Sequence, residues 1–283
     1  MRAAAILGPG DVSKVVADFQ RATGTQWTSL IEQADAIVIF GGDGTIHHQL
    51  ATLLDLDVPL LIVPCGSGND FARALGLRQS KDSVNAWRRF VHGEKNIRQV
   101  DLGIIAQPNS SHYFCCVAGV GLDSQITRRA NDLPRWFRKH GGYALTAPRE
   151  FLRFAPFPMK ISLDGNSADG ISAAPFKPMT LAAVANAPTY GGGMKIAPHA
   201  KLDDGKLDLC AVRGMDVFKL FCLFPTVFLG RHLGIEAVEY EQTERIRIET
   251  EHPLDVYADG EFVCQTPVEF SVARDVLKVI VPG

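Results

Sequence analysis

The sequence lacks three features that would place it in a special class of protein. No apolar run reaches the ~18 residues of a membrane-spanning helix, and the apolar N-terminal stretch is too short for a secretory signal, which predicts a cytoplasmic protein. Neither sign of charge dominates, since 29 Lys and Arg stand against 31 Asp and Glu, which argues against binding to nucleic acid. Cysteine is scarce and has no C-x-x-C spacing, so we interpret the six cysteines as reduced core residues rather than metal ligands: Cys65, Cys115, Cys116, Cys210, Cys222 and Cys264.

What is present is the composition of an ordinary globular protein, and its length suits two domains. The chain has 283 residues, of which 46% are hydrophobic and 21% charged. In the first hundred residues, short apolar runs at 3–7, 36–40 and 60–63 alternate with helical patterns at 12–19, 46–54 and 71–75. This order predicts an α/β domain with a parallel sheet over residues 1–100.

The rest of the chain has a different pattern. Short strand candidates at 179–185, 207–212, 244–249, 256–258, 262–265 and 277–281 are joined by turn signals such as Asp164-Gly165 and Asp259-Gly260. This pattern predicts an antiparallel β-sandwich domain over 101–283, with helical inserts near 123–153 and 215–230. The last strand is a candidate to return to the region between the domains.

The strongest local signal is the GGDGT turn formed by Gly41, Gly42, Asp43, Gly44 and Thr45, between an apolar strand and a helix. Ligands bind α/β sheets at the carboxyl ends of the strands, and glycines let a backbone approach phosphate closely. A carboxylate there is unfavourable beside phosphate unless Mg²⁺ or a hydroxyl proton lies between them. The alternative is a tight turn in which Asp43 caps a helix.

A second glycine-rich turn follows the next strand and contains Gly66, Ser67, Gly68 and Asn69. Two such turns on neighbouring parallel strands converge at one edge of the sheet, which favours a shared nucleotide site over two unrelated turns.

GGDGT followed by GSGNDFAR resembles the diacylglycerol kinase/sphingosine kinase catalytic family, in its soluble bacterial branch. Further matching stretches extend the resemblance to 281: 100–103, 184–187, 190–193, 197–198, 202–208, 230–233 and 259–261. GGDGT alone also suits NAD kinase or phosphofructokinase, whereas GSGNDFAR and DDGKLD favour the lipid kinases.

The resemblance implies a catalytic site in a cleft between an ATP-binding α/β domain and a β-sandwich. It implies that the two glycine turns hold ATP, with Ser67 where the family usually has Thr. Glu261 matches the proposed proton acceptor, Asp43 would help Mg²⁺ to offset phosphate charge, and Asp101 matches an acidic residue near the catalytic region. It also implies a Mg²⁺ site in the sandwich, formed by the Asp204 side chain and the backbone carbonyls of Lys201 and Lys206.

The sequence departs from the family pattern at His47 and His48, where the family usually has Asn-Glu. Because this change is at the nucleotide end of the site, the sequence leaves open whether the nucleotide is ATP or GTP. We expect the two histidines to be solvated or to face phosphate, because neighbours on a helix point about 100° apart and do not form a metal pair.

Two further features of the sequence each have two possible interpretations. A basic and aromatic run around Trp136 and Phe137 is either a solvated face or a contact with anionic lipid, and the phenylalanines of 218–228 are either core or an acyl-chain groove.

The sequence therefore predicts a lipid kinase of phospholipid metabolism that uses ATP and Mg²⁺. It also predicts that the protein is cytoplasmic and binds peripherally to membranes. The lipid is open among diacylglycerol-like lipids, phosphatidylglycerol, a sphingoid base and a polyprenol, and a homodimer is open as the assembly. The alternatives are a NAD-kinase-like enzyme acting on a soluble nucleotide and a regulator that binds nucleotide or lipid without turnover.

Overall fold

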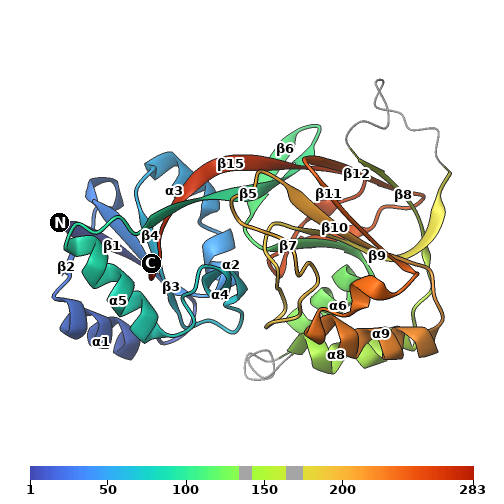
Figure 1. The fold of residues 1–283 in the computed structure, drawn as a ribbon, viewed down its shortest axis with the longest axis horizontal. Helices are drawn as coiled ribbons and strands as arrows, with labels where there is room; N and C mark the ends of the chain where they lie inside the picture. The colour runs from blue at the N-terminus through green and yellow to red at the C-terminus, as the bar shows by residue number, and fades with distance from the viewer. Residues whose placement is uncertain (134–141, 164–174) are drawn as a thin grey trace.

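A computed structural model describes residues 1–133, 142–163 and 175–283 of the chain (Figure 1). Its first half is a parallel sheet in the order β2 (Gln26–Trp27), β1 (Arg2–Leu7), β3 (Ala36–Gly41) and β4 (Leu60–Pro64). Every residue of β3 is buried, as the absence of polar residues in this run predicts.

Helices cover both faces of this sheet. α1 (Ser13–Thr23) and α5 (Ser80–Val91) lie together on one face and α3 (Leu50–Leu56) lies on the other (Figure 1). Two short helices, α2 (Asp43–His47) and α4 (Asp70–Ala74), directly follow the glycine-rich turns, and a 3₁₀ turn, η1 (Ile31–Gln33), precedes β3. The single helix predicted over 46–54 is thus two helices, with a break at His48 and Gln49.

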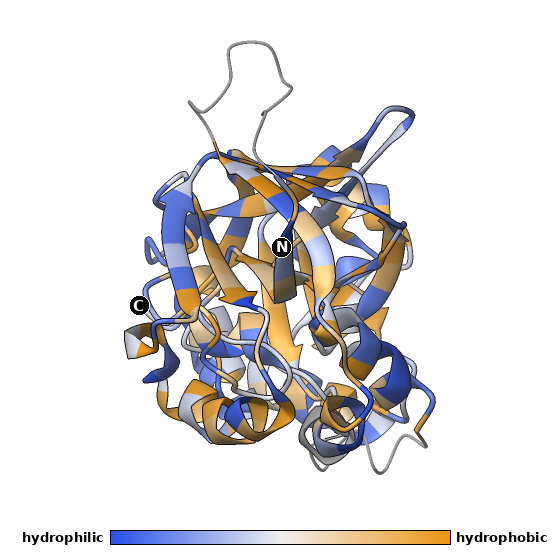
Figure 2. Ribbon diagram, turned by 90° about the vertical axis from the view of Figure 1, so that its right-hand side faces the viewer, coloured by the Kyte–Doolittle hydropathy of each residue, from blue (hydrophilic) through white to orange (hydrophobic). Residues whose placement is uncertain are grey.

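The second half is built from antiparallel strands whose inward-facing residues form a core of their own. In chain order they are β5 (Ile97–Gln107), β6 (Ser110–Phe114), β7 (Val117–Gly121), β8 (Phe157–Leu163), β9 (Lys177–Ala185), β10 (Leu207–Arg213), β11 (Val238–Thr243), β12 (Arg245–Thr250), β13 (Asp255–Ala258), β14 (Glu261–Gln265) and β15 (Val268–Ile280). The predicted combination of a parallel α/β half and an antiparallel sandwich is confirmed. Figure 2 shows apolar strands in the interior and polar loops around them.

Both predicted helical inserts exist and lie together against the sandwich (Figure 1). The first contains α6 (Leu122–Asn131) and α8 (Gly142–Phe151), and the second contains α9 (Val217–Leu229), followed by a 3₁₀ turn, η2 (His232–Gly234). α9 begins where the Asp216 carboxylate accepts the Lys219 N–H at 2.9 Å, and it ends at Gly230, whose φ of 68° favours glycine. No helix in the described part of the chain is both long and apolar enough to cross a membrane.

The long strands β5 and β15 run side by side through both halves (Figure 1). Near its end β15 also pairs in parallel with β4, with Val279 opposite Leu60. Residue 100 lies inside β5, and a separation into domains at that position stays a prediction. Leu277, Val279 and Ile280 are buried in the same core as β3 and β4.

Candidate functional site

The two glycine-rich turns contact each other backbone to backbone at the carboxyl ends of β3 and β4. The Asp43 N–H donates to the Gly68 carbonyl at 3.1 Å, and the Cys65 N–H donates to the Gly41 carbonyl at 3.1 Å. A Cβ atom on Gly42 would lie 2.1 Å from the Gly68 oxygen. These glycines are therefore required by the contact between the turns, whatever ligand binds over them.

Asp43 is a buried capping residue for the neighbouring turn. Its carboxylate accepts the backbone N–H groups of Asp70 at 2.9 Å and Phe71 at 3.1 Å, at the start of α4. Burial, and then the nearby charge of Asp70, raise the pKa of Asp43 to about 7, although the two N–H groups act in the opposite direction. The alternative in which Asp43 caps a helix therefore describes its contacts, but the helix that it caps is α4 and not α2, to which Asp43 belongs.

Of the other residues predicted to bind nucleotide, Thr45 and Asn69 fix the shape of the two turns, whereas Ser67 is accessible to a ligand. The Thr45 side chain lies so close over Gly41 that a Cβ there would be 2.6 Å from the Thr45 hydroxyl. Asn69 accepts the Gly66 N–H at 3.1 Å and donates to the Gly66 carbonyl at 3.0 Å, which fixes the second turn. Ser67 is exposed between these residues and is free to contact a ligand.

The hairpin between β13 and β14 brings Glu261 to the first glycine turn. A Cβ on Gly44 would lie 3.0 Å from Glu261 Oε1, and Glu261 Oε2 lies 3.7 Å from His48 Nε2. The predicted turn at Asp259-Gly260 is confirmed, with Ala258 paired opposite Glu261. Glu261 is thus in contact with GGDGT although the two are more than two hundred residues apart.

Asp259 anchors this hairpin and contacts a histidine from the first half. Its side chain is fully buried and accepts the Cys115 N–H at 2.9 Å and the Cys116 N–H at 2.8 Å, and His47 Nδ1 lies 3.1 Å from it. Burial lowers the pKa of His47, but the hydrogen bond and charge of Asp259 and the charge of Glu261 outweigh it and raise that pKa above its ordinary value. This pair was not predicted from the sequence, where its one sign is that His47 and His48 replace the usual Asn-Glu.

A second link joins the GSGNDFAR turn to the sandwich. The buried Asp70 carboxylate binds the Arg73 guanidinium and accepts the Gly192 N–H at 2.8 Å. Gly192 belongs to the glycine-rich loop at 190–193, a stretch that matches the family but whose role the sequence did not predict. This loop is therefore held against the nucleotide turns.

Asp101 is buried, and its carboxylate is engaged by backbone groups. Its carboxylate accepts the Gly205 N–H at 2.7 Å and the Asp275 N–H at 2.8 Å. It fixes the DDGKLD turn against an irregular part of β15, so these contacts are structural. A catalytic role for Asp101 stays a prediction.

The predicted metal ligands lie in that same DDGKLD turn. Asp204 accepts the Lys206 N–H at 3.2 Å, while the Lys201 and Lys206 side chains are exposed. Burial raises the pKa of neighbouring Asp208, and the charge of Asp204 adds to this effect. Carboxylate and carbonyl oxygens suit Mg²⁺, and the excess of negative charge between these two aspartates fits a bound cation.

Within the described residues, Cys115, Cys116 and Asp259 place their possible ligand atoms close enough together to hold a metal ion. Burial raises the pKa of both thiols, so both are protonated, and Asp259 is already satisfied by backbone N–H groups and His47. We therefore keep the interpretation of free thiols. All six cysteines are free and four are buried, but Cys222 is exposed on α9, contrary to its prediction as a core residue.

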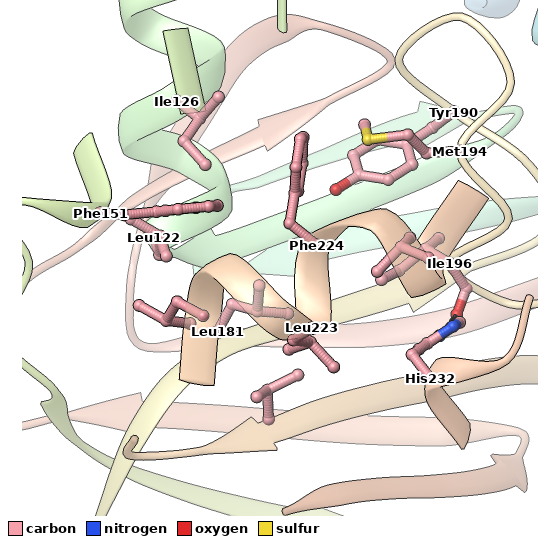
Figure 3. Close-up of a pocket in the computed structure, with 13 residues that line it drawn as sticks. Leu122, Ile126, Phe151, Leu181, Tyr190, Met194, Ile196, Leu223, Phe224 and His232 are labelled. Atoms are coloured by element: carbon pink, nitrogen blue, oxygen red, sulfur yellow. Dashed lines mark hydrogen bonds between the residues drawn. The ribbon is translucent and has the colours of Figure 1, made fainter. Parts of the chain in front are cut away.

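An apolar pocket lies between the helices α6, α8 and α9 and the strands β9 and β10 (Figure 3). It encloses about 480 Å³ of empty space, part of which is open to solvent. Its lining is almost entirely apolar: Leu122, Ile126, Phe151, Leu181, Tyr190, Met194, Ile196, Val212, Leu220, Leu223, Phe224, Val227 and His232. Tyr190 and Met194 belong to the loop held by Asp70, so one end of the pocket lies next to the glycine turns.

The two predictions on aromatic residues have different outcomes. Phe224 of α9 lines the pocket, whereas Phe218, Phe221 and Phe228 are 77%, 40% and 39% exposed, so the helix has both a core face and an open face. Trp136 and Phe137, like the Asp164-Gly165 turn, lie outside the described residues.

Comparison with known proteins agrees with this arrangement. The family of the diacylglycerol kinase catalytic domain matches residues 7–105, and that of the YegS C-terminal NAD kinase beta sandwich-like domain matches 116–281. The chain is 36% identical over 252 residues to a diacylglycerol kinase of Mycobacterium tuberculosis, covering 88% of this chain and 77% of that protein.

Two further relatives extend the comparison. A diacylglycerol kinase of Bacillus subtilis is 26% identical over 266 residues, which is 92% of this chain and 82% of that protein. The crystal structure of a diacylglycerol kinase from Bacillus anthracis shares the fold at 21% identity, with a TM-score of 0.67 over 99% of this chain and 96% of that one. The chain therefore belongs to the bacterial diacylglycerol kinase and YegS-like lipid kinase family.

Proposed function

We propose that the protein transfers the γ-phosphoryl group of ATP to the hydroxyl group of a lipid. The observation that carries this proposal is the contact between Glu261 and Gly44, because it joins a carboxylate to a glycine turn of the type that binds phosphate. Phosphoryl transfer requires mainly positioning and charge neutralisation, and this site has the residues for both.

The roles follow from the contacts. ATP would lie over Gly41, Gly42, Gly44 and Thr45 and over the second turn at 66–69, with the exposed Ser67 hydroxyl available to its phosphates. Mg²⁺ bound with ATP supplies neutralisation of the phosphate charge. Asp43 can contribute to that site, since each carboxylate oxygen keeps a second lone pair beside its hydrogen bond to α4.

Glu261 would accept the proton of the lipid hydroxyl. Its side chain is 41% exposed, so substrate can reach it, and its neighbours Gly44 and His48 are on the nucleotide side of the site. The hydrogen bonds of Asp259 and the His47 contact hold the hairpin that carries it. Asp101 would act indirectly, by fixing the turn at 202–206 and the start of the last part of β15.

The apolar pocket would take the hydrocarbon chain of the lipid. It begins at the loop that Asp70 holds against the nucleotide turns, so a chain in the pocket can place its head group towards Glu261. The exposed face of α9, formed by Phe218, Phe221, Phe228 and Leu229, would contact the membrane from which the lipid is taken. Exposed basic residues around it, Arg153, Lys219 and Arg231, suit an anionic surface.

The decisive experiment replaces Glu261 by Gln, which keeps the shape and removes the basic oxygen. We expect turnover to fall at least about 10²-fold with little change in ATP affinity, since the nucleotide contacts are in the other half. The matched control is Glu269→Gln, a partly exposed glutamate on β15, which should leave both values unchanged. A Glu261→Gln protein with more than about half the wild-type turnover on its lipid would contradict the proposal.

A radiolabelled ATP assay with a mixed lipid extract, with NAD and with no acceptor separates the proposal from its alternatives. Label in lipid supports the kinase, and label in NAD identifies a NAD-kinase-like enzyme. Nucleotide binding without transfer identifies a regulator, which the His47-His48 replacement favours. The same assay with GTP decides the nucleotide.

A further inference from the structure

The hairpin that carries Glu261 contacts helix α2 at two histidines of different burial. His48 Nε2 lies 3.7 Å from Glu261 Oε2, and the two side chains are 64% and 41% exposed, so solvent screens this pair. His47 Nδ1 lies 3.1 Å from Asp259 Oδ2, and these side chains are 11% and 0% exposed. A hydrogen bond is stronger where water is excluded, so the His47 contact is the one that holds the hairpin to α2.

The His47 contact determines how Glu261 meets the first glycine turn. Glu261 follows Asp259 by two residues, and Gly44, where a Cβ would lie 3.0 Å from Glu261 Oε1, precedes His47 by three. Residues three apart on a helix lie on one face, so α2 meets the hairpin at two neighbouring points. A shift at His47 therefore moves Glu261 relative to this turn.

The shape of the hairpin is fixed separately, by the sandwich. The Asp259 carboxylate accepts two backbone N–H groups of the segment before β7, and Asn131 of α6 donates to the Gly260 carbonyl at 2.7 Å. Without His47 these contacts remain. We therefore expect loss of His47 to leave the hairpin folded but free to shift against α2.

We infer that His47 is a positioning residue, which holds Glu261 at the nucleotide turn through its hydrogen bond to Asp259. The inference rests on the proposed function. The family usually has Asn at position 47, and asparagine Nδ2, like histidine Nδ1, is bonded to Cγ and donates from the same place. The imidazole differs because it can carry a charge, and a charged donor makes the stronger hydrogen bond.

The groups around His47 favour its charged form. They are Asp259 and Glu261 of the hairpin, the Cys115 thiol before β7, and Asp43 and His48 of its own helix. Burial lowers the pKa of His47, but the hydrogen bond and the two hairpin charges outweigh it and raise that pKa, while burial raises the pKa of the Cys115 thiol and keeps it neutral. The charge of His47 is therefore present at low pH and lost as the pH rises through its folded pKa.

Steady-state kinetics of two variants test the positioning role. His47→Ala should lower kcat about 10- to 100-fold and keep the KM for ATP within about twofold, because a misplaced base slows transfer without removing nucleotide contacts. His47→Asn keeps the donor and should restore kcat to that of wild type at alkaline pH. The matched control is His92→Ala, an exposed histidine at the end of α5, which should change neither value. Equal kcat in His47→Ala and wild type would overturn the inference.

The pH profile separates positioning from a general loss of stability. From about pH 6 to about pH 9, the ratio of wild-type to His47→Asn turnover should fall about three- to tenfold and approach unity, as the imidazole loses its charge. Asp43 and Glu261 are common to both proteins, so their own titration cancels in the ratio. A ratio that does not change with pH would overturn the inference, and this comparison does not depend on whether His47→Ala folds.

Hydrogen exchange tests the contact without catalysis. Peptides over 255–265 should exchange faster in His47→Ala than in wild type or His47→Asn, whereas peptides of β3 should not differ. If wild type phosphorylates no lipid but the hairpin exchanges in this order, the kinase proposal fails while the His47 contact stands. If lipid is phosphorylated but the hairpin exchanges equally in all three proteins, the inference is wrong and the function stands.

Discussion

At the scale of single residues, buried carboxyl groups dominate the candidate site. Asp43, Asp70, Asp101 and Asp259 all accept backbone N–H groups from segments distant in the sequence. Each therefore fixes the position of one loop relative to another. The free energy required to keep each of these carboxylates charged and buried depends on which groups or ligands lie beside it.

The carboxyl group of Asp43 should release a proton when nucleotide and metal bind. Its pKa of about 7 reflects burial beside Asp70, and a cation beside it would lower that pKa. At pH 7 we expect release of roughly half a proton on binding of Mg²⁺ with a non-hydrolysable ATP analogue. Calorimetry in buffers of different ionisation enthalpy measures this number. Asp43→Asn should bind without it, and release of the same size in Asp43→Asn would assign the proton elsewhere.

The His47 and Asp259 contact should make stability depend on pH. The pKa of folded His47 is raised above the ordinary value of 6.5, so its contribution is fully present below that value. It is then lost as the pH rises through the folded pKa. Urea unfolding from about pH 5.5 to about pH 8.5 should show wild type losing its advantage over His47→Asn in this direction. A difference that grows with pH would show that the imidazole is not stabilised in its charged form.

At the scale of elements, α9 is the helix with two apolar faces. Phe218→Ser with Leu229→Ser should reduce sedimentation with anionic vesicles and leave the melting temperature nearly unchanged, because both side chains are mostly exposed. Leu30→Ser, at a half-exposed position in the α/β half, is the control and should sediment as wild type does. Unchanged vesicle binding in the double variant would remove α9 from the membrane contact.

The sequence predicted those elements whose patterns are strong and local. The three apolar runs of the α/β half became β1, β3 and β4. β3 and most of β4 are buried, as expected for runs without a polar member, whereas β1 also has exposed residues such as Leu7. It missed β7, a Val117–Gly121 strand with two glycines and no alternation. It also missed α5, although Gln79 and Asp82 form a capping box at its start and Val84, Trp87 and Val91 have helical spacing.

The candidate site was predictable where a motif carried it and not where distant segments meet. The two glycine turns were expected at one edge of the sheet because parallel strands end together. The contacts of His47 with Asp259, Asp70 with Gly192 and His232 with Ile196 were not predictable, because each joins segments that the local pattern cannot bring together. Tertiary packing alone determines them.

At the scale of the whole molecule, bound Mg²⁺ at Asp204 should stabilise the fold. A ligand that binds only the native state stabilises it by about 2.7 kcal/mol at a hundredfold excess over Kd. We expect EDTA to lower the melting temperature of wild type to that of Asp204→Ala, and to leave the variant unchanged. Asp203→Ala, the exposed neighbour that pairs with Arg98, is the control and should still respond to EDTA. If EDTA does not change the melting temperature of the wild-type protein, the turn at Asp204 is an ordinary turn that binds no stabilising metal ion.

The last strand completes the first sheet, and this ties folding to the order of synthesis. The end of β15 lies beside β4, and Pro282 accepts a hydrogen bond from Arg89 of α5. Strands β1 to β4 emerge first from the ribosome, whereas the part of β15 that pairs with β4 follows it in the chain by more than two hundred residues. The sheet edge beside β4 therefore stays open until β15 has been synthesised, and this interval is when a chaperone would be needed.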